Sequence, residues 1–350
     1  MQQEYHDALS GMQGRSILVI GDMVADIYLD GRISRISREA PVLVLEQAGE
    51  KVVAGGAANV VNNIATLGGK VHAVGLVGRD ESADGLRAIL AANGADVRGL
   101  IADDSRPTIS KTRIIAGGRA TVSQQIVRID RESRAPMAPA VEAELRAYIK
   151  SVLPTVEGVV ISDYGSGTVT EGLQSLLIDY CRAHDIPSIV DSRYAVRRFH
   201  GIGYVKQNDA EIAAAMGREL VTTEDIVRAA EELRQELAAK GVLVTRGELG
   251  MVLVEHGAVH EIPVSDKSEV FDVSGAGDTC GALTPCMASL VVMTGRRMNL
   301  TPNKKVMNTE KPPMVAEGTL LATQLPTTVN TSTLTIMIRP FLISRFLFLW

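Results

Sequence analysis

The chain has 350 residues, of which 46% are hydrophobic, and its 36 Lys and Arg against 41 Asp and Glu give a net charge of −5. This length and apolar content suffice for one large core with an accessory element. The acidic balance and the dispersed basic residues argue against a nucleic-acid partner, and no apolar stretch is long enough to span a bilayer.

The cysteines and the first residues indicate a compartment. Cys181, Cys280 and Cys286 are odd in number and lack metal-ligand spacing, which favours thiols in a reducing cytosol over a disulfide framework. The N-terminal segment carries acidic residues early and has no apolar signal core. We therefore expect a cytoplasmic protein with no membrane partner.

Strand-like apolar runs alternate with helical patterns along most of the chain. Strands are expected at Ile17–Ile20, Val71–Val77, Val159–Ser162, Ser188–Asp191, Val242–Thr245 and Met251–Glu255. Helices are expected at Val141–Leu153, Glu171–His184 and Thr223–Lys240. This alternation predicts an α/β fold in which helices flank a mostly parallel central sheet, with ligands at the carboxyl ends of its strands.

A second group of segments has β character without intervening helices. These segments are Ile27–Ile33, Val42–Gln47, Ile109–Ile115 and Gln124–Ile129. They predict a small separate sheet, with strands inside residues 26–47 and 109–129.

A glycine-rich turn near the end of this pattern carries a carboxylate. In Asp272-Val-Ser-Gly-Ala-Gly-Asp-Thr279, Gly275, Ala276 and Gly277 leave backbone N–H groups uncovered, which is suited to a transferring phosphoryl group. Asp278 beside them is placed to remove a proton from an attacking hydroxyl. The alternative is an ordinary glycine turn before a helix.

Polar residues after the first strand are candidates for substrate contact. Asp26 either caps a turn or binds substrate hydroxyls. Gly55, Gly56 and Asn59 either begin a helix over residues 60–67 or bring backbone and an amide close to a ligand. Later in the chain, Asn208 with Glu211 three residues on is close to a helix capping box.

Taken together and in order, seven segments resemble the ribokinase-like (pfkB) family of sugar kinases. The segments are Ser16–Asp22, Arg35–Val42, Ala54–Asn59, Ser162–Gly165, Asn208–Glu211, Val244–Gly247 and Asp272–Thr279. The resemblance covers roughly residues 14 to 285. It is closest to bacterial heptose 7-phosphate kinases, through residues 35–42 and 124–130. It implies a three-layer sandwich with a small β-sheet lid that often forms a dimer surface.

The resemblance also implies ATP with Mg²⁺ and the transfer of a phosphoryl group to heptose 7-phosphate, giving heptose 1,7-bisphosphate. Asp278 would be the general base, helped by the backbone of Gly275, Ala276 and Gly277. The sugar would contact Asp26, Gly55, Gly56 and Asn59. The nucleotide would lie near Asn208, Glu211, Thr245, Arg246 and Gly247, with Glu211 reaching the metal through water. We expect kinase activity alone, because the His-x-Gly-His motif of a fused nucleotidyltransferase is missing.

Three basic residues on the expected lid strands are candidates for holding the phosphate of the sugar. Lys111, Arg113 and Arg128 match basic positions in the heptose kinases, and the alternative is a solvated strand face. Elsewhere the chain departs from the family, with Ser166 and Arg193 at positions where a Lys is common. Arg193 is a non-isosteric replacement for the missing cation.

The composition changes after about residue 284. Residues 279–350 contain seven Lys and Arg against two acidic residues, whereas the preceding part is acidic. We therefore divide the chain into a kinase domain, residues 1–284, and an atypical tail, residues 285–350. The change of composition suggests that the tail is translated from a shifted reading frame, and the alternative is genuine divergence of the sequence. A kinase for another sugar and a catalytically impaired sugar-phosphate-binding protein are the alternative functions. A homodimer through the lid sheet is the expected assembly.

Overall fold

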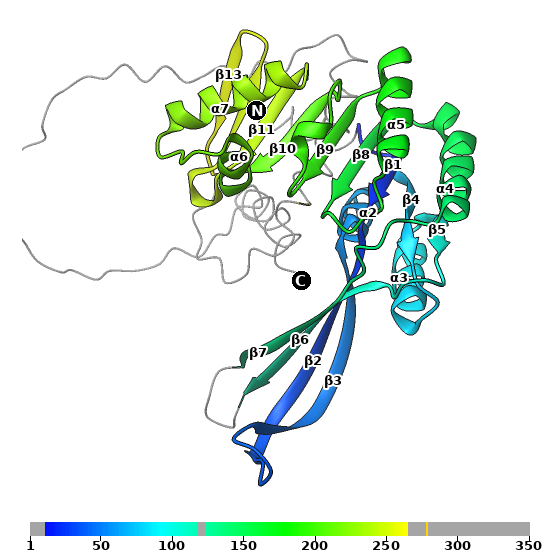
Figure 1. Cartoon of the computed structure of the whole chain (residues 1–350), viewed down its shortest axis with the longest axis vertical. Coiled ribbons are helices and arrows are strands. Elements are labelled where there is room, and N and C mark those ends of the chain that lie inside the picture. Colours follow the sequence, from blue (N-terminus) through cyan, green and yellow to red (C-terminus); the bar gives the residue numbers. More distant parts are fainter. Residues whose placement is uncertain (1–10, 118–122, 265–277, 279–350) are drawn as a thin grey trace, which may run out of the picture.

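The computed structural model describes residues 11–117, 123–264 and 278, which form two β-sheets and the helices around them (Figure 1). The predicted turn at Gly275–Gly277 and the predicted tail, residues 285–350, lie outside the described residues. The domain division therefore stays a prediction.

The large sheet has nine strands in the order β13-β12-β11-β10-β9-β8-β1-β4-β5. The strands from β11 to β5 are parallel, and β12 and β13 complete one edge in antiparallel fashion. Their bounds are β1 Ser16–Gly21, β4 Lys70–Val77, β5 Asp96–Ala102, β8 Gly158–Asp163, β9 Ser188–Ser192, β10 Tyr204–Asn208, β11 Gly241–Thr245, β12 Met251–Glu255 and β13 Ala258–Ile262.

Helices cover both faces of this sheet. They are α2 Ala57–Thr66, α3 Glu81–Ala92, α4 Pro139–Val152, α5 Glu171–Ala183, α6 Asp209–Met216 and α7 Thr223–Glu236, with short 3₁₀ turns η1 Leu153–Thr155, η2 Val196–Arg198 and η3 Gly247–Leu249. Among the described residues, no helix is long and apolar enough to cross a membrane.

The alternation of side chains along β1 explains the layers. Ile17 and Val19 pack into a core with α2 and α3, whereas Leu18 and Ile20 pack into a second core with α4, α5 and α7. Because successive residues of a strand point to opposite faces, one apolar strand supplies both cores. The parallel direction of the inner strands brings their carboxyl ends to one edge, which is where a site was expected.

The small sheet has four strands in the order β3-β2-β6-β7 and projects from the body as a long ribbon (Figure 1). Its bounds are β2 Met23–Ile36, β3 Leu43–Gly56, β6 Ile109–Gly117 and β7 Gln124–Arg131. We call it the lid sheet. The pairs β2–β3 and β6–β7 are antiparallel, and β2 and β6 are parallel.

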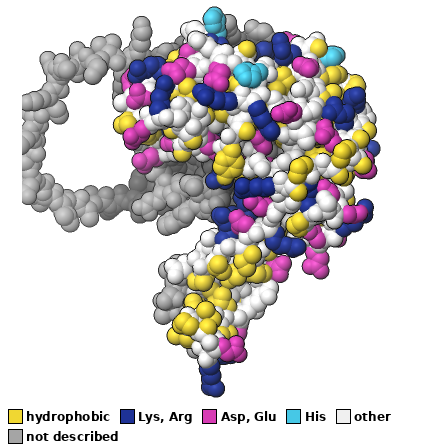
Figure 2. All heavy atoms as spheres, in the orientation of Figure 1, with side chains coloured by type: hydrophobic (Ala, Val, Ile, Leu, Met, Phe, Trp, Pro, Cys, Tyr) yellow, Lys and Arg dark blue, Asp and Glu magenta, His cyan; other side chains and the backbone are white. Residues whose placement is uncertain are grey.

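The register gives the lid sheet one polar and one apolar face. Residues opposite one another in the ladder share a face. Asp26, Tyr28, Lys111, Arg113 and Arg128 thus lie on the polar face. The other face carries Ile27, Leu29, Thr112, Ile114, Val127 and Ile129. Hydrophobic side chains gather visibly on this sheet in Figure 2.

The predicted alternation and both sheets are confirmed, with differences in extent. The helix expected at 223–240 ends at Glu236, and β2 and β3 extend well beyond the predicted lid strands. The sequence analysis missed β5, β10, β13 and α3, and of α6 it indicated only the start, through the capping box of Asn208 and Glu211. Strand β10 was missed because Lys206 and Gln207 interrupt its apolar pattern, although both are buried.

Candidate active site

Asp278 is held by one side chain from α2 and one from the loop after β8. Asn59 Nδ2 donates to its Oδ2 at 3.0 Å, and the Tyr164 hydroxyl donates to its Oδ1 at 2.9 Å. The carboxylate is only 7% exposed. Both of its oxygens are thus oriented by donors, which fixes the carboxylate at one position near the carboxyl edge of the sheet.

Asn59 reaches Asp278 because of the way β3 turns into α2. Gly56 is the N-cap of α2 and has φ of 54°, a left-handed conformation that favours glycine. At Gly55, an added Cβ would stand 2.2 Å from Asp26 Oδ2. The two glycines therefore let the chain turn closely around Asp26 and place Asn59 in the first helical turn. The helical alternative for Asn59 is correct, and its sugar contact stays a prediction.

Tyr164 is positioned by the buried carboxylate of Asp22. One Asp22 oxygen accepts the backbone N–H of Tyr164 at 2.8 Å and that of Ser166 at 3.1 Å, and the other accepts that of Thr168 at 3.3 Å. Asp22 is fully buried. It therefore pins the loop after β8, which delivers the Tyr164 hydroxyl to Asp278.

The surroundings of Asp278 act on its basicity in opposite directions. Burial raises the pKa of the carboxyl, while the hydrogen bonds from Asn59 and Tyr164 and the charge of Lys206 lower it, and the net shift is upward. A raised pKa brings a carboxylate closer to the basicity that proton abstraction requires. The group is therefore suited to act as a general base.

A buried ion pair joins two neighbouring strands of the large sheet, β9 and β10. Lys206 Nζ of β10 is 2.7 Å from Asp191 Oδ2 of β9, and the two residues are partners in the parallel ladder. Burial raises the pKa of Asp191 to about 6, and Lys206 opposes that rise. The charges of Glu211 and Asp278 also act on both groups. This pair therefore belongs to the same electrostatic cluster as Asp278.

The lid sheet contributes Asp26, Arg113 and Lys111 to the site. Arg113 Nη1 lies 2.5 Å from Asp26 Oδ1. Lys111 Nζ lies 5.6 Å from the centroid of the Tyr164 ring, in a cation–π geometry. Since the hydroxyl of that ring binds Asp278, Lys111 lies at the end of the lid sheet that is nearer to Asp278. Arg113 lies two residues farther along β6, on the same face.

Arg128 occupies a different environment. It forms two hydrogen bonds to Asp130 on its own strand, at 2.8 and 3.0 Å, and its side chain is 48% exposed. The register places it opposite Arg113. The structure thus puts Arg128 at the exposed border of the polar lid face, and its phosphate contact stays a prediction.

The predicted nucleotide residues gather at the ends of β10 and β11. Asn208 and Glu211 form a full capping box at α6, each side chain accepting the other's backbone N–H at 2.8 Å. Asn208 is the ladder partner of Thr245. Arg246 Nη1 donates to Thr223 Oγ1 at 3.1 Å, and Gly247 has φ of 53° with open space around its α-carbon.

These residues fit Mg²⁺ only through water and phosphate oxygens. Glu211 Oε2 is engaged in the cap, which leaves Oε1 for an outer-sphere contact. In the described part of the chain, no three His, Cys, Asp or Glu side chains form a metal-binding group. Mg²⁺ generally keeps several waters and binds through substrate phosphates.

Arg193 lies against its neighbour in the chain. Its guanidinium is 5.5 Å from the ring centroid of Tyr194, which is 70% exposed. Its role as a replacement for the missing lysine stays a prediction. The sequence analysis gave no role to Tyr164, Asp191 or Lys206. The sequence feature that could have identified Lys206 is a lysine within a strand whose sheet has helices on both faces.

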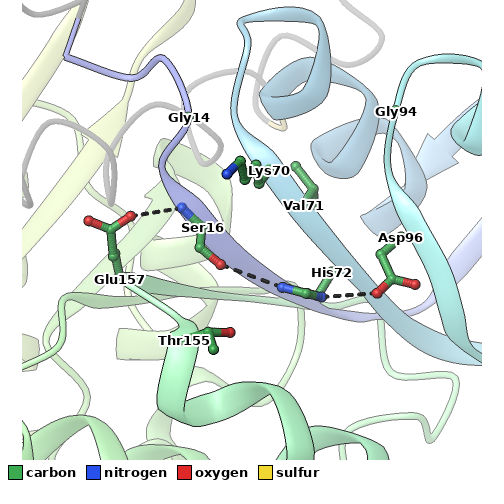
Figure 3. A pocket seen from close by; sticks show the side chains of 9 residues that line it. All are labelled: Gly14, Ser16, Lys70, Val71, His72, Gly94, Asp96, Thr155 and Glu157. Atoms are coloured by element: carbon green, nitrogen blue, oxygen red, sulfur yellow. Dashed lines mark hydrogen bonds and ion pairs between the residues drawn. The ribbon is translucent and has the colours of Figure 1, made fainter.

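A cavity of about 410 Å³ lies at the opposite edge of the sheet, where β1, β4 and β5 begin (Figure 3). There Ser16 Oγ is 3.4 Å from His72 Nε2, and His72 Nδ1 is 3.3 Å from Asp96 Oδ2. Although this order resembles a hydrolytic triad, the Ser16 N–H donates to the Glu157 carboxylate at 3.0 Å, which puts negative charge where an oxyanion would form. We interpret the network as structural.

Comparison with known proteins places the sequence among sugar kinases. The profile of the pfkB family carbohydrate kinases matches residues 15–289. The chain is 39% identical over 320 residues to the bifunctional protein HldE of Azorhizobium caulinodans, covering 90% of this chain and 64% of that protein. It is 40% identical over 266 residues to HldE of Geobacter sulfurreducens, and this match covers 75% of this chain and 53% of that protein. The chain thus spans between about half and two thirds of these relatives.

Two solved structures share the fold. A ribokinase of Arabidopsis thaliana, complexed with ribose and ATP, superposes with a TM-score of 0.61 and 18% identity, covering 79% of this chain and 86% of that one. Phosphofructokinase-2 of Escherichia coli, in complex with substrates and products, superposes with a TM-score of 0.59 and 23% sequence identity. This match covers 82% of this chain and 88% of that one. The predicted ribokinase-like sandwich is confirmed.

Proposed function

Because the chain belongs to the pfkB family of carbohydrate kinases, we propose that it transfers the γ-phosphoryl group of ATP to a hydroxyl of a sugar phosphate. The observation that carries this proposal is the buried Asp278 carboxylate, oriented by Asn59 and Tyr164 beside the polar face of the lid sheet. A fixed carboxylate with a raised pKa is the group that an attacking hydroxyl needs.

In the proposed reaction the sugar hydroxyl attacks the γ-phosphorus while its proton passes to Asp278. Asn59 and Tyr164 keep the carboxylate oriented, and Asp26 and Lys111 border the space where the sugar would lie. Glu211 would hold Mg²⁺ through water, and that ion would supply positive charge beside the β- and γ-phosphates. Closure of the lid sheet over the sugar would exclude water and limit the hydrolysis of ATP.

The substrate we propose is heptose 7-phosphate, phosphorylated at O1. Support comes from the two lid arginines and Lys111, because a substrate phosphate needs charge-assisted donors away from the reacting hydroxyl. The resemblance of residues 35–42 and 124–130 to heptose 7-phosphate kinases favours the same choice. The alternative is another sugar phosphate, such as fructose 6-phosphate, since Ser166 and Arg193 depart from the heptose kinase pattern.

The test is the release of ADP by the full chain with Mg²⁺ and ATP. We would compare heptose 7-phosphate, fructose 6-phosphate and no sugar, for the wild type and Asp278→Asn. Turnover with the heptose, lowered about 10³-fold by the substitution, supports the proposal. If the wild type prefers fructose 6-phosphate, that sugar phosphate takes the place of heptose 7-phosphate as the proposed substrate. A folded wild type that binds heptose 7-phosphate without turnover supports the alternative of an impaired sugar-phosphate-binding protein.

We also propose a cytoplasmic homodimer. The location is supported by the choice of ATP as the phosphoryl donor. The dimer is supported by the apolar face of the lid sheet, where Val127 is 45% and Ile129 is 51% exposed. Apolar side chains aligned on one sheet face are typical of a surface that another subunit covers.

A further inference from the structure

The loop of residues 164–170, between β8 and α5, carries the Tyr164 hydroxyl that orients Asp278. It contains Gly165 and Gly167, whose φ angles of 80° and 89° lie in the left-handed region. Glycine loses more backbone freedom on folding than any other residue, so a loop with two glycines is costly to hold in one shape. The position of the Tyr164 hydroxyl therefore depends on the contacts that anchor this loop.

Arg198, the last residue of η2, bonds to both ends of the loop. Its Nη2 lies 3.2 Å from Asp163 Oδ2 and donates to the Val169 carbonyl at 2.8 Å. Asp163 directly precedes Tyr164, and Val169 directly precedes Thr170, the N-cap of α5. A single guanidinium nitrogen therefore closes the loop at its base.

Asp163 joins this arginine to the neighbouring strand. The carboxylate is buried, and its Oδ2 also accepts the Ser192 hydroxyl at 2.7 Å, from the residue that is its ladder partner on β9. Its Oδ1 accepts the Gly165 N–H at 3.1 Å. Asp22 holds the middle of the loop from the opposite side, through the N–H groups already described. The loop thus has one anchor inside it and a second, centred on Asp163 and Arg198, at its base.

Stability alone is a weak explanation for Arg198. Its Nε is buried and has no hydrogen-bond partner within the described part of the chain, and an unpaired buried donor costs free energy. Its ion pair with a buried carboxylate also costs hydration. The neighbouring Arg197 has an ordinary surface position, 52% exposed and paired with Glu236. What distinguishes Arg198 is its contact with the loop that carries Tyr164.

We propose that Arg198 is a positioning residue, which closes the base of the loop of residues 164–170 and so keeps the Tyr164 hydroxyl on Asp278. This deepens the proposed function and rests on it. The charges that act most strongly on Asp278 are those of Lys206 and Asp26. An effect of Arg198 on the proposed base would therefore pass through the loop and its tyrosine.

The test compares Arg198→Met, Tyr164→Phe and their double variant in the full chain. Arg197→Met is the matched control, because it removes a guanidinium from the adjacent residue without touching the loop. Arg198→Met leaves the buried Asp163 carboxylate without its cation, which can prevent folding. If the melting temperature shows that it does not fold, Arg198→Met combined with Asp163→Asn takes its place in every comparison.

We would measure steady-state kinetics and the pKa of Asp278, the latter by carbon NMR of labelled aspartate carboxylates with Asp278→Asn to assign the signal. Arg198→Met should lower kcat about tenfold and change the KM for ATP and for the sugar by less than about threefold. It should raise the pKa of Asp278 as Tyr164→Phe does, because the same hydrogen bond is lost. The double variant should be no worse than either single variant, since both act through one contact. Arg197→Met should match the wild type.

The NMR titration keeps the inference separate from the proposed function. If the wild type turns over no sugar, the kinase proposal fails. An equal rise in the pKa of Asp278 in Arg198→Met, Tyr164→Phe and the double variant then still supports the role of Arg198. If the wild type is an active kinase and Arg198→Met leaves that pKa unchanged, the inference alone fails. Additive effects of the two substitutions also overturn it, because they would show that Arg198 acts independently of Tyr164.

Discussion

The Tyr164 hydroxyl donates a hydrogen bond of 2.9 Å to the Asp278 carboxylate, joining residues 114 positions apart in the chain. Burial and the negative charge of Asp278 raise the pKa of Tyr164 well above its usual range, so this hydroxyl keeps its proton. Tyr164 is therefore a permanent donor to the proposed base. It orients the carboxylate and stabilises its charged form.

Tyr164→Phe should lower kcat about tenfold and move the acidic limb of the pH–rate profile to higher pH. The bond lowers the pKa of Asp278, so its loss raises that pKa further. Asp278 has to be ionised to accept a proton, and activity is therefore lost at a higher pH as the solution is acidified. The measurement is kcat/KM against pH. Tyr180→Phe, whose ring stacks on His184, is the control. An unmoved acidic limb would contradict the assignment.

The residues that meet at the site were partly predictable from the sequence. Strand runs ending in Asp22 and Ser162 and a glycine turn at Asp278 indicated one sheet edge, because parallel strands share their carboxyl ends. The Tyr164–Asp278 and Arg113–Asp26 contacts were not predictable. The Arg113–Asp26 contact depends on the register of β2 and β6, where a one-residue slip would point each side chain to the other face. The Tyr164–Asp278 contact depends on the path of the loop after β8, which Asp22 holds through long-range hydrogen bonds.

Asp22→Ala should destabilise the fold by about 3 kcal/mol, because it leaves three buried backbone N–H groups without an acceptor. Asp22→Asn keeps one acceptor oxygen and should lose less. Urea unfolding of the full chain measures both. Asp104→Ala removes an exposed carboxylate and should change the free energy of unfolding by less than about 0.5 kcal/mol. Equal losses at Asp22 and Asp104 would show that the buried carboxylate is not a structural anchor.

Arg113→Ala should raise the KM for the sugar phosphate about tenfold or more, with a smaller effect on kcat. Its guanidinium is largely buried against Asp26 and is well placed to exchange that partner for a substrate phosphate. Arg128→Ala should have a weaker effect, because its exposed side chain already binds Asp130. The comparison is made by steady-state kinetics with phosphorylated and unphosphorylated sugar. An equal rise in KM for both sugars would assign Arg113 to the sugar ring instead of the phosphate.

The tail can be tested at the level of the gene. We expect the DNA beyond the codon of residue 284 to encode a family-like continuation in another reading frame, as the change of charge balance suggests. The alignment with the Azorhizobium protein covers 90% of the chain, however, and residues 1–284 make up only about four-fifths of it. That alignment therefore includes part of the tail, and it is the observation that supports the alternative of divergence. Resequencing of the gene decides between the two explanations, because no other reading frame should encode a family-like continuation if the tail has diverged.

Val127→Asp should convert a dimer into a monomer. Val127 shares the apolar face of the lid sheet with Ile114 and Ile129, and a buried carboxylate at its centre would lose hydration without gaining a partner. The matched control is Val221→Asp, at a valine that is 75% exposed on the main body. Sedimentation velocity over a range of concentrations measures both. A wild type that stays monomeric would contradict the proposed homodimer. A dimer that persists in Val127→Asp would show that the interface lies on another surface.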